Sequence, residues 1–260
     1  MTNNKKYSCI IFIIIVLLTI YFTSDIIFSK TLLKFIIDTT SNQSIQHSED
    51  YIKNHVQEPS DELNAHWLRL IKHYVPLPLE SGYGSHKLAL LAALLLTAKD
   101  GGPVVEMGCG YHSTLLLHQL AVDRQKRYVL STDTDREWLL KFQNNMSSSL
   151  HQFRFINRVS EWNSVGNDRP RWSIAFIDHK PGERRVVDII RLINMTDLII
   201  VHDSETASYQ YERGLQYYPY RYHYTYLSTA TDVASRTKAT LLSNIKYLLE
   251  LTINLKVPKQ

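Results

Sequence analysis

The chain has 260 residues, of which 44% are hydrophobic and 21% charged, a composition that is ordinary for a globular protein. The formal net charge is +4, and the basic residues are scattered, with short adjacent pairs such as Arg184 and Arg185. Because this pattern lacks the basic stripe of a nucleic-acid-binding protein, we expect no nucleic-acid partner.

The N-terminal segment is strongly apolar. Residues 7–23 are almost entirely apolar and follow Lys5 and Lys6. This length is near the lower limit for a membrane span, and the residues after it form a poor signal-peptidase site. We therefore expect a cytosolic tail at residues 1–6 and an uncleaved transmembrane signal anchor at residues 7–23, with a cleaved signal peptide as the alternative.

Two observations agree with a lumenal position for the rest of the chain. Glycosylation sequons begin at Asn42, Asn145 and Asn194. The only two cysteines, Cys9 and Cys109, lie in the anchor and in a glycine-containing turn, so we expect no disulfide between them. The sequence thus predicts a single-pass type II membrane protein of the Golgi or endoplasmic reticulum.

Beyond the anchor, we expect a stem or linker at residues 24–58 and a catalytic domain at residues 59–260. Ser60 is a suitable N-cap for a helix whose apolar residues are spaced by three and four. A strongly apolar helix is expected over residues 86–99, closed by two glycines and Pro103.

Strand and helix patterns then alternate. We expect strands over residues 103–107, 127–132, 153–159, 172–177 and 197–201, with helices over residues 113–120, 136–146 and 186–193. This alternation predicts a parallel sheet with helices on both faces, whose strands share one carboxyl edge where ligands bind. Alternating tyrosines over residues 218–226 and a partner at residues 227–234 predict a terminal antiparallel hairpin, followed by a helix at residues 238–255. The tyrosine face either packs on the protein or contacts a sugar.

A glycine-containing turn follows the first predicted strand. The strand ends at Glu106, and Gly108 and Gly110 stand at alternate positions before a helix-like stretch that begins near Ser113. A buried strand, a tight turn and a helix start form the arrangement that binds a nucleotide-like cofactor. A dinucleotide fingerprint has a third glycine where this chain has Ser113, so NAD is the poorer interpretation.

This turn resembles motif I of the class I S-adenosylmethionine-dependent methyltransferases, with the pattern acid-x-Gly-x-Gly. The resemblance extends from about residue 86 to residue 236. It implies a Rossmann-like α/β fold, mostly parallel with a terminal antiparallel hairpin and helices on both faces. It also implies S-adenosylmethionine as cofactor, with Glu106, Gly108, Gly110 and Ser113 at the cofactor site.

The resemblance assigns further cofactor residues to the ends of the second and third strands. Asp133 stands where an acid accepts hydrogen bonds from the cofactor ribose, whereas Asp135 caps the next helix. Glu161 and Trp162 stand where residues flank the adenine, and the indole is suited to stack on it. The alternatives are that both aspartates only cap the helix and that Trp162 is a partly buried packing residue.

Charged residues also follow the fourth and fifth strands. Asp178 and His179 come after one apolar run, and His202 and Asp203 end the next. Buried charges cost free energy unless they are paired, so these four residues are candidate catalytic groups. Either Asp178 and Asp203 share a divalent metal ion that orients a substrate hydroxyl, or a histidine acts as general base.

The same segments are similar to catechol-type O-methyltransferases and to Golgi glucuronoxylan O-methyltransferases. This chain has Asp203-Ser204 where the catechol type has Asp-Asn, which leaves a third metal ligand without a counterpart. The resemblance implies O-methylation of a glycan or another hydroxyl of the secretory pathway. Two alternatives remain: a glycosyltransferase that uses Asp133-Thr134-Asp135 to hold a nucleotide sugar, and a non-catalytic protein of the same fold.

Overall fold

The computed structural model describes residue 38 and residues 41–259. Two compact units are distinguished, residues 1–47 and residues 48–260. The expected tail and anchor lie outside the described residues. Within the described part of the chain, no helix combines the length and apolar character that a membrane crossing requires. Residues 41–47 of the first unit and residues 48–55 of the second are helical, so part of the expected stem forms regular structure.

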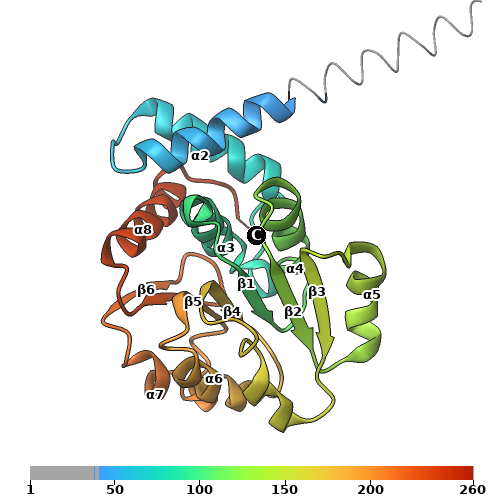
Figure 1. Cartoon of the computed structure of the whole chain (residues 1–260). Coiled ribbons are helices and arrows are strands. Elements are labelled where there is room, and N and C mark those ends of the chain that lie inside the picture. Colours follow the sequence, from blue (N-terminus) through green and yellow to red (C-terminus); the bar gives the residue numbers. More distant parts are fainter. Residues whose placement is uncertain (1–37, 39–40, 260) are drawn as a thin grey trace, which may run out of the picture. The chain divides into compact units, whose positions relative to one another are not determined.

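Strands and helices alternate along the second unit (Figure 1). The strands are β1 (Val104–Met107), β2 (Val129–Asp133), β3 (His151–Phe155), β4 (Trp172–Ile177), β5 (Thr196–His202), β6 (Tyr220–Tyr224) and β7 (Thr231–Ser235). The α-helices are α2 (Asp61–Tyr74), α3 (Lys87–Leu96), α4 (Thr114–Leu116), α5 (Arg136–Met146), α6 (Arg185–Arg191), α7 (Glu212–Leu215) and α8 (Ala239–Asn254). A π-helix, η3 (Leu117–Arg124), continues α4, and short turns form η1 (Gly82–Gly84), η2 (Ala98–Asp100), η4 (Val159–Ser164), η5 (Gly182–Arg184) and η6 (Ala207–Tyr209).

The seven strands form one sheet in the order β3-β2-β1-β4-β5-β7-β6. The five strands from β3 to β5 are parallel, whereas β7 runs antiparallel to both β5 and β6. The chain reverses direction across the sheet between β1 and β4, the kind of switch point beside which open α/β sheets bind ligands. The predicted mostly parallel sheet with a terminal antiparallel hairpin is confirmed.

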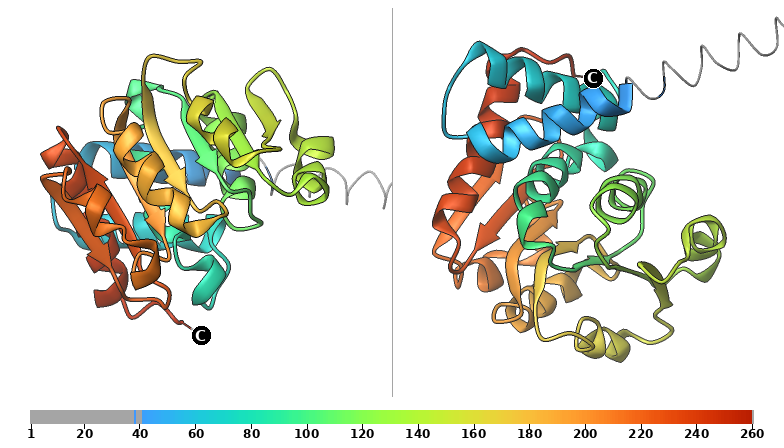
Figure 2. Two further views of the ribbon diagram at one scale, coloured as in Figure 1. Left: turned by 90° about the horizontal axis from the view of Figure 1, so that it is seen from below. Right: turned by 45° about the horizontal axis from the view of Figure 1, so that its top comes forward.

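Helices cover both faces of this sheet. On one face α3 contacts β4, β5 and α8, and Figures 1 and 2 show α3 and α8 side by side. The other face forms an apolar core with residues of α6 and α7. Alternate residues of β4 divide between the faces, with Ala175 and Ile177 in this second core. The central strands are buried on both sides, which explains their continuous apolar sequence.

Local sequence determines where several elements begin. The Ser60 hydroxyl accepts a hydrogen bond from the Leu63 amide at 3.0 Å, as expected for the N-cap of α2. Asp135 caps α5 in the same way, accepting from the Trp138 amide at 2.9 Å. The predicted bounds of α5 and β4 are those observed.

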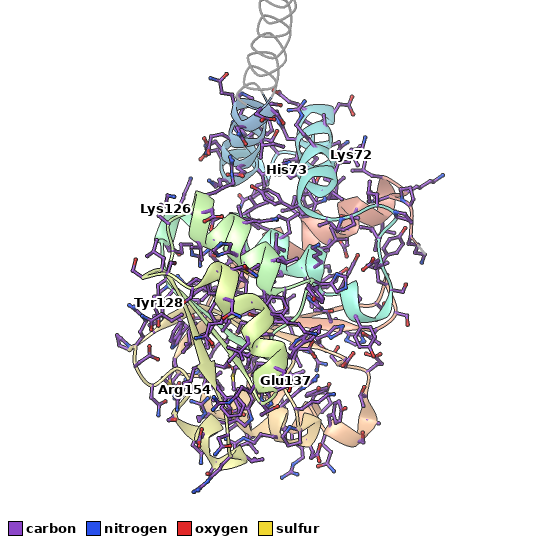
Figure 3. All side chains as sticks on the ribbon, turned by 90° about the vertical axis from the view of Figure 1, so that its right-hand side faces the viewer. Lys72, His73, Lys126, Tyr128, Glu137 and Arg154 are labelled. Atoms are coloured by element: carbon purple, nitrogen blue, oxygen red, sulfur yellow. The ribbon has the colours of Figure 1, made fainter. Side chains whose placement is uncertain are left out.

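The third strand differs from the prediction. β3 spans His151–Phe155, whereas residues 153–159 were expected, because pairing with β2 places His151 opposite Val129. The apolar face of α5 packs on this edge of the sheet, where α5 contacts β3. Figure 3 labels Glu137 on α5 and Arg154 on β3. The residues directly after the strand are therefore Ile156 and its neighbours, not Ser160 to Trp162. The predicted adenine contacts, Glu161 and Trp162, thus do not directly follow β3.

Candidate active site

A cavity of about 590 Å³ lies at the carboxyl edge of the parallel strands. This volume is within the range of small-molecule and cofactor sites. The loops after four strands line it: Gly108, Cys109, Gly110 and Ser113 after β1; Asp133, Thr134 and Asp135 after β2; Asp178, His179 and Lys180 after β4; His202 and Asp203 after β5. Helices and other loops add Tyr83, His86, Tyr111, His112, Trp138, Arg185 and Tyr209.

The glycine turn after β1 touches the end of β4. Gly108 has φ +99°, a conformation that side chains disfavour, and a Cβ here would lie 2.6 Å from the backbone of Asp178. Its amide donates to the Thr132 carbonyl, and the Asp178 amide donates to the Met107 carbonyl, both at 2.8 Å. Only glycine fits at this position, where the turn holds three strand ends together.

Glu106 lies beneath the turn rather than in the cavity. Its side chain is fully buried and accepts a hydrogen bond from the Thr114 hydroxyl at 3.0 Å. The same hydroxyl accepts from the Gly110 amide at 2.9 Å, so Glu106 shapes the turn through Thr114. Burial raises the pKa of Glu106 to about 7, although neighbouring hydroxyls, including that of Ser113, oppose the shift. Direct contact between Glu106 and a ligand does not agree with this burial.

Asp133 lines the cavity at the end of β2. One carboxylate oxygen accepts from the Cys109 amide and the other from the Asp135 amide, each at 2.8 Å. These two bonds fix the carboxylate beside the glycine turn. Because Asp135 is occupied in capping α5, the two acids do not present the open pair that an Asp-x-Asp metal site needs.

The predicted adenine contacts are displaced from the cavity. Trp162 is fully buried, and its ring stacks on the ring of His179 with centroids 4.1 Å apart. An indole with no exposed surface has no face for an adenine. Glu161 accepts from the Asn157 amide at 3.1 Å and does not line the cavity. Both differences follow from the earlier end of β3.

A second hollow continues from the cavity at this end. Thr134, Lys180 and Tyr209 line both spaces, and residues 156–159 after β3 line the second one. The Tyr209 ring covers Gly182 so closely that a Cβ there would lie 2.2 Å from the ring. The segment after β3 thus contributes to the site, as the position after a third strand predicts, but through different residues.

In the part of the cavity wall formed after β4 and β5, two carboxylates face one guanidinium. Arg185 Nη2 lies 2.9 Å from Asp178 Oδ1, and Arg185 Nη1 lies 3.5 Å from Asp203 Oδ2. The Asp178 and Asp203 side chains retain 26% and 29% exposure, whereas that of Arg185 retains 5%. Asp203 adopts φ +55°, a conformation unusual for a residue with a side chain and frequent at functional sites. The arrangement leaves both carboxylates accessible to a ligand.

His202 is buried between these carboxylates and two hydroxyls. Its Nδ1 lies 3.2 Å from Asp178 Oδ2, and its Nε2 lies 2.9 Å from Thr229 Oγ1, 3.0 Å from Ser85 Oγ and 3.2 Å from the Gly82 carbonyl. Burial acts to lower the pKa of His202, but the facing carboxylates raise it above the ordinary value. The facing carboxylates therefore favour the protonated form of the ring, which does not favour its predicted role as general base.

His179 belongs to a different network. Its side chain has no exposed surface, and its Nε2 lies 3.2 Å from Asp188 Oδ2. Asp188 is itself fully buried and bonded to Arg184 at 2.9 Å and to Arg191 at 3.0 Å. Burial lowers the pKa of His179 despite this carboxylate. A sealed ring cannot exchange protons with an acceptor in the cavity, so the predicted catalytic role of His179 does not agree with the structure.

The predicted metal pair is bridged by Arg185. A guanidinium already neutralises Asp178 and Asp203, which does not favour a cation shared by these two acids alone. Sequence reasoning noted Arg185 only as part of a basic pair and passed over His86, which lies in the cavity wall at the start of α3. The apolar stretch preceding Asp178 gave no indication that either residue would approach it.

No protein-family model and no curated protein matches the chain. Among solved structures, the chain is similar to the O-methyltransferase from Bacillus cereus in complex with SAH, at 13% identity and TM-score 0.45, covering 72% of this chain and 96% of that one. It is also similar to human methyltransferase-like protein 13 in complex with SAH, at 13% identity and TM-score 0.46, covering 64% and 92%.

A third similar structure is an SAH-bound methyltransferase of Podospora anserina, at 10% identity and TM-score 0.44, covering 72% of this chain and 94% of that one. The strand order, the antiparallel seventh strand and the glycine turn after β1 are observed in this chain itself. Its fold is the Rossmann-like fold of class I methyltransferases.

Proposed function

We propose that this protein is an S-adenosylmethionine-dependent O-methyltransferase. One observation supports the proposal most strongly: a single cavity is lined by a glycine turn with a fixed carboxylate and by two accessible carboxylates. The turn and Asp133, here called the cofactor end, suit a nucleoside cofactor, and Asp178 and Asp203, here called the acceptor end, suit an acceptor that must lose a proton. The methyltransferase fold and the SAH in the structures similar to this chain also support it.

In the cofactor end, the turn at Gly108 and Gly110 lets the cofactor approach the backbone closely. Asp133 accepts hydrogen bonds from the ribose hydroxyls through lone pairs that its two backbone donors leave available. The hollow lined by residues 156–159 receives the adenine in place of the predicted contact with Trp162.

In the acceptor end, the hydroxyl oxygen attacks the methyl carbon in line with the sulfur. An O–C bond forms, the C–S bond breaks with its electron pair staying on sulfur, and the acceptor proton passes to a carboxylate. Asp178 and Asp203 are the groups placed for that transfer, because both are partly exposed. Arg185 and His202 hold the two carboxylates in place, and positioning supplies much of the rate.

Titration calorimetry of the full-length protein with S-adenosylmethionine and SAH tests this proposal. Asp133→Ala should weaken both by at least about tenfold, because it removes charge-assisted hydrogen bonds to the ribose. Asp135→Ser is the matched control, since serine preserves the cap of α5 while removing the second acid. No binding by the folded wild-type protein would reject the proposal. Manganese-dependent binding of a nucleoside diphosphate, lost in both variants, would favour a glycosyltransferase instead.

We further propose that residues 7–23 anchor the enzyme in the Golgi or endoplasmic reticulum, with the catalytic domain in the lumen and a glycan hydroxyl as acceptor. The apolar segment after Lys5 and Lys6 and the three sequons support this placement. The side chain of Asn145, at the end of α5, is exposed as a modification site must be. Protease protection of the domain in intact microsomes is the expected result, and digestion without detergent would contradict it.

A further inference from the structure

Three side chains meet in the cavity wall from distant parts of the chain. His86 lies at the start of α3, Asp178 follows β4, and His202 ends β5. Each offers one nitrogen or oxygen atom, and these three atoms lie within 4.8 Å of one another. Two imidazoles and one carboxylate are a ligand set that transition metals use in proteins.

The hydrogen bonds of His202 determine which of its nitrogens is free. The Gly82 carbonyl, 3.2 Å away, can only accept, so Nε2 donates its hydrogen on that side. In the neutral ring, Nδ1 then carries a lone pair, lies 3.2 Å from Asp178 Oδ2 and has no hydrogen-bond partner. Two lone-pair atoms at this separation repel each other unless a cation, either a proton or a metal ion, lies between them. A donor bond from the far nitrogen is also the usual way in which proteins orient a metal-binding histidine.

His86 distinguishes the two possibilities. It is buried to 2% exposure, yet neither of its ring nitrogens has a hydrogen-bond partner. Its ring packs against the rings of Phe176 and His202, with centroids 4.7 Å and 4.6 Å away. A buried imidazole without partners is costly, and a proton shared between His202 and Asp178 would leave that cost in place. A metal ion would satisfy one nitrogen of His86 as well.

We propose that His86, Asp178 and His202 bind one divalent transition-metal ion of the zinc type at the acceptor end of the cavity. Tetrahedral ligands of such an ion, at bond lengths of about 2.0–2.2 Å, lie about 3.3–3.6 Å apart, which is close to the 3.2 Å between His202 Nδ1 and Asp178 Oδ2. The His86 side chain closes the remaining separation when the ion binds. Magnesium and calcium prefer oxygen ligands and are disfavoured by two imidazoles.

This site differs from the pair expected from sequence. Asp178 is common to both, and its Oδ1 faces Arg185 at 2.9 Å while its Oδ2 lies 3.2 Å from His202 Nδ1; His86 and His202 replace Asp203. All three ligands line the cavity, so an open coordination position faces the space for the acceptor. The role of the ion rests on the proposed function: it would bind the acceptor hydroxyl, lower its pKa and leave Asp203 to take the proton. Metal binding itself does not depend on that role.

The test is cobalt titration of the full-length, chelator-treated protein, followed by visible absorption and equilibrium dialysis. We expect one equivalent of Co²⁺, a spectrum changed by nitrogen ligation, displacement by Zn²⁺ and no competition by Mg²⁺. His86→Ala should weaken binding by at least about tenfold. His223→Ala is the matched control, because His223 also lies 3.0 Å from an aspartate, Asp232, but it is on β6, two strands from β5, and does not line the cavity.

Several results would overturn the site: no saturable binding by the folded wild-type protein, a spectrum identical to that of free Co²⁺, or equal losses in His86→Ala and His223→Ala. If His86→Ala does not fold, as judged by circular dichroism, His86→Gln serves in its place and the wild-type spectrum still decides. S-adenosylmethionine binding is measured on the same samples. Cobalt binding without cofactor binding would support the site and contradict the proposed function, and the reverse would do the opposite.

Discussion

His179 and His202 occupy similar positions in the sequence and opposite environments in the structure. Each directly follows or ends an apolar strand and lies next to an aspartate in the chain. His202 faces Asp178 and Asp203 at the cavity, whereas the ring of His179 is sealed between Trp162 and Asp188. Two histidine–aspartate–arginine networks therefore lie at the ends of the adjacent strands β4 and β5. The network around His202 is open to a ligand, and the network around His179 is closed.

The difference arises from alternation along the chain. Asp178 and His179 are neighbours, and successive side chains of an extended segment point to opposite sides. The Asp178 side chain faces the cavity, so the His179 side chain faces the core beside α6, where it lies 3.2 Å from Asp188. A charged residue at a strand end thus acquires a functional or a structural role according to the direction in which it points.

The largest effect, a loss of stability, is expected in the closed network, which consists of Asp188 with His179, Arg184 and Arg191. Asp188→Asn keeps the side-chain volume but removes the charge that faces His179, Arg184 and Arg191. Breaking a buried ion pair from one side costs about 3–5 kcal/mol, which we expect as a loss in free energy of unfolding by urea titration. Because this network is sealed from the cavity, S-adenosylmethionine affinity of the folded fraction should not change. A loss of affinity without a loss of stability would contradict the comparison.

In the open network, the expected loss is in catalysis. Asp178→Asn should reduce methyl transfer by about a hundredfold, because it removes a proton acceptor and the charge that Arg185 and His202 face. Cofactor binding should persist, because the Asp178 backbone, not its side chain, contacts the turn at Gly108. Single-turnover transfer and calorimetry on one preparation measure the two effects. Full activity would remove Asp178 from the mechanism.

The two histidines should give opposite dependences of stability on pH in chelator-treated protein. The folded-state pKa of His202 is raised above 6.5, so its stabilising contribution is complete below that pH and is lost as the pH rises through the raised value. The pKa of His179 is lowered, so its contribution is present above 6.5 and is lost as the pH falls. Unfolding free energies are measured from about pH 5 to about pH 9. That of His202→Gln should differ from wild type most at the acidic end, and that of His179→Gln most at the alkaline end. Parallel curves would show that the environments are alike.

Much of the fold was predictable because it depends on local patterns. The apolar strands, the cap at Asp135 and the glycine turn are each encoded within a few residues, and the shared carboxyl edge follows from parallel connections. This placed Asp133, Asp178, His202 and Asp203 in one cavity from sequence alone.

The remainder depends on tertiary contacts that no local pattern contains. Arg185 enters the site from the start of α6, and His86 from the start of α3, both distant in the chain from the residues they meet. The close approach at Gly108 is also a tertiary contact that no local pattern contains. A Cβ added there would lie 2.6 Å from the backbone of Asp178, so Gly108→Val would disturb the sheet edge as well as cofactor binding. For that reason Asp133 is the better residue for testing the cofactor.

The smallest effect is expected at Glu161, where the position of a strand end decides the outcome. If β3 ended at Val159, Glu161 would reach the cofactor, and Glu161→Gln would weaken S-adenosylmethionine binding much as we expect of Asp133→Ala. The strand ends at Phe155 instead, and the Glu161 carboxylate accepts only the Asn157 amide at 3.1 Å outside the cavity. Glutamine can keep that bond through its carbonyl oxygen. We therefore expect a change of less than about twofold in dissociation constant, as for ordinary surface substitutions. A tenfold loss by calorimetry would show that the segment after β3 rearranges to bring Glu161 to the cofactor.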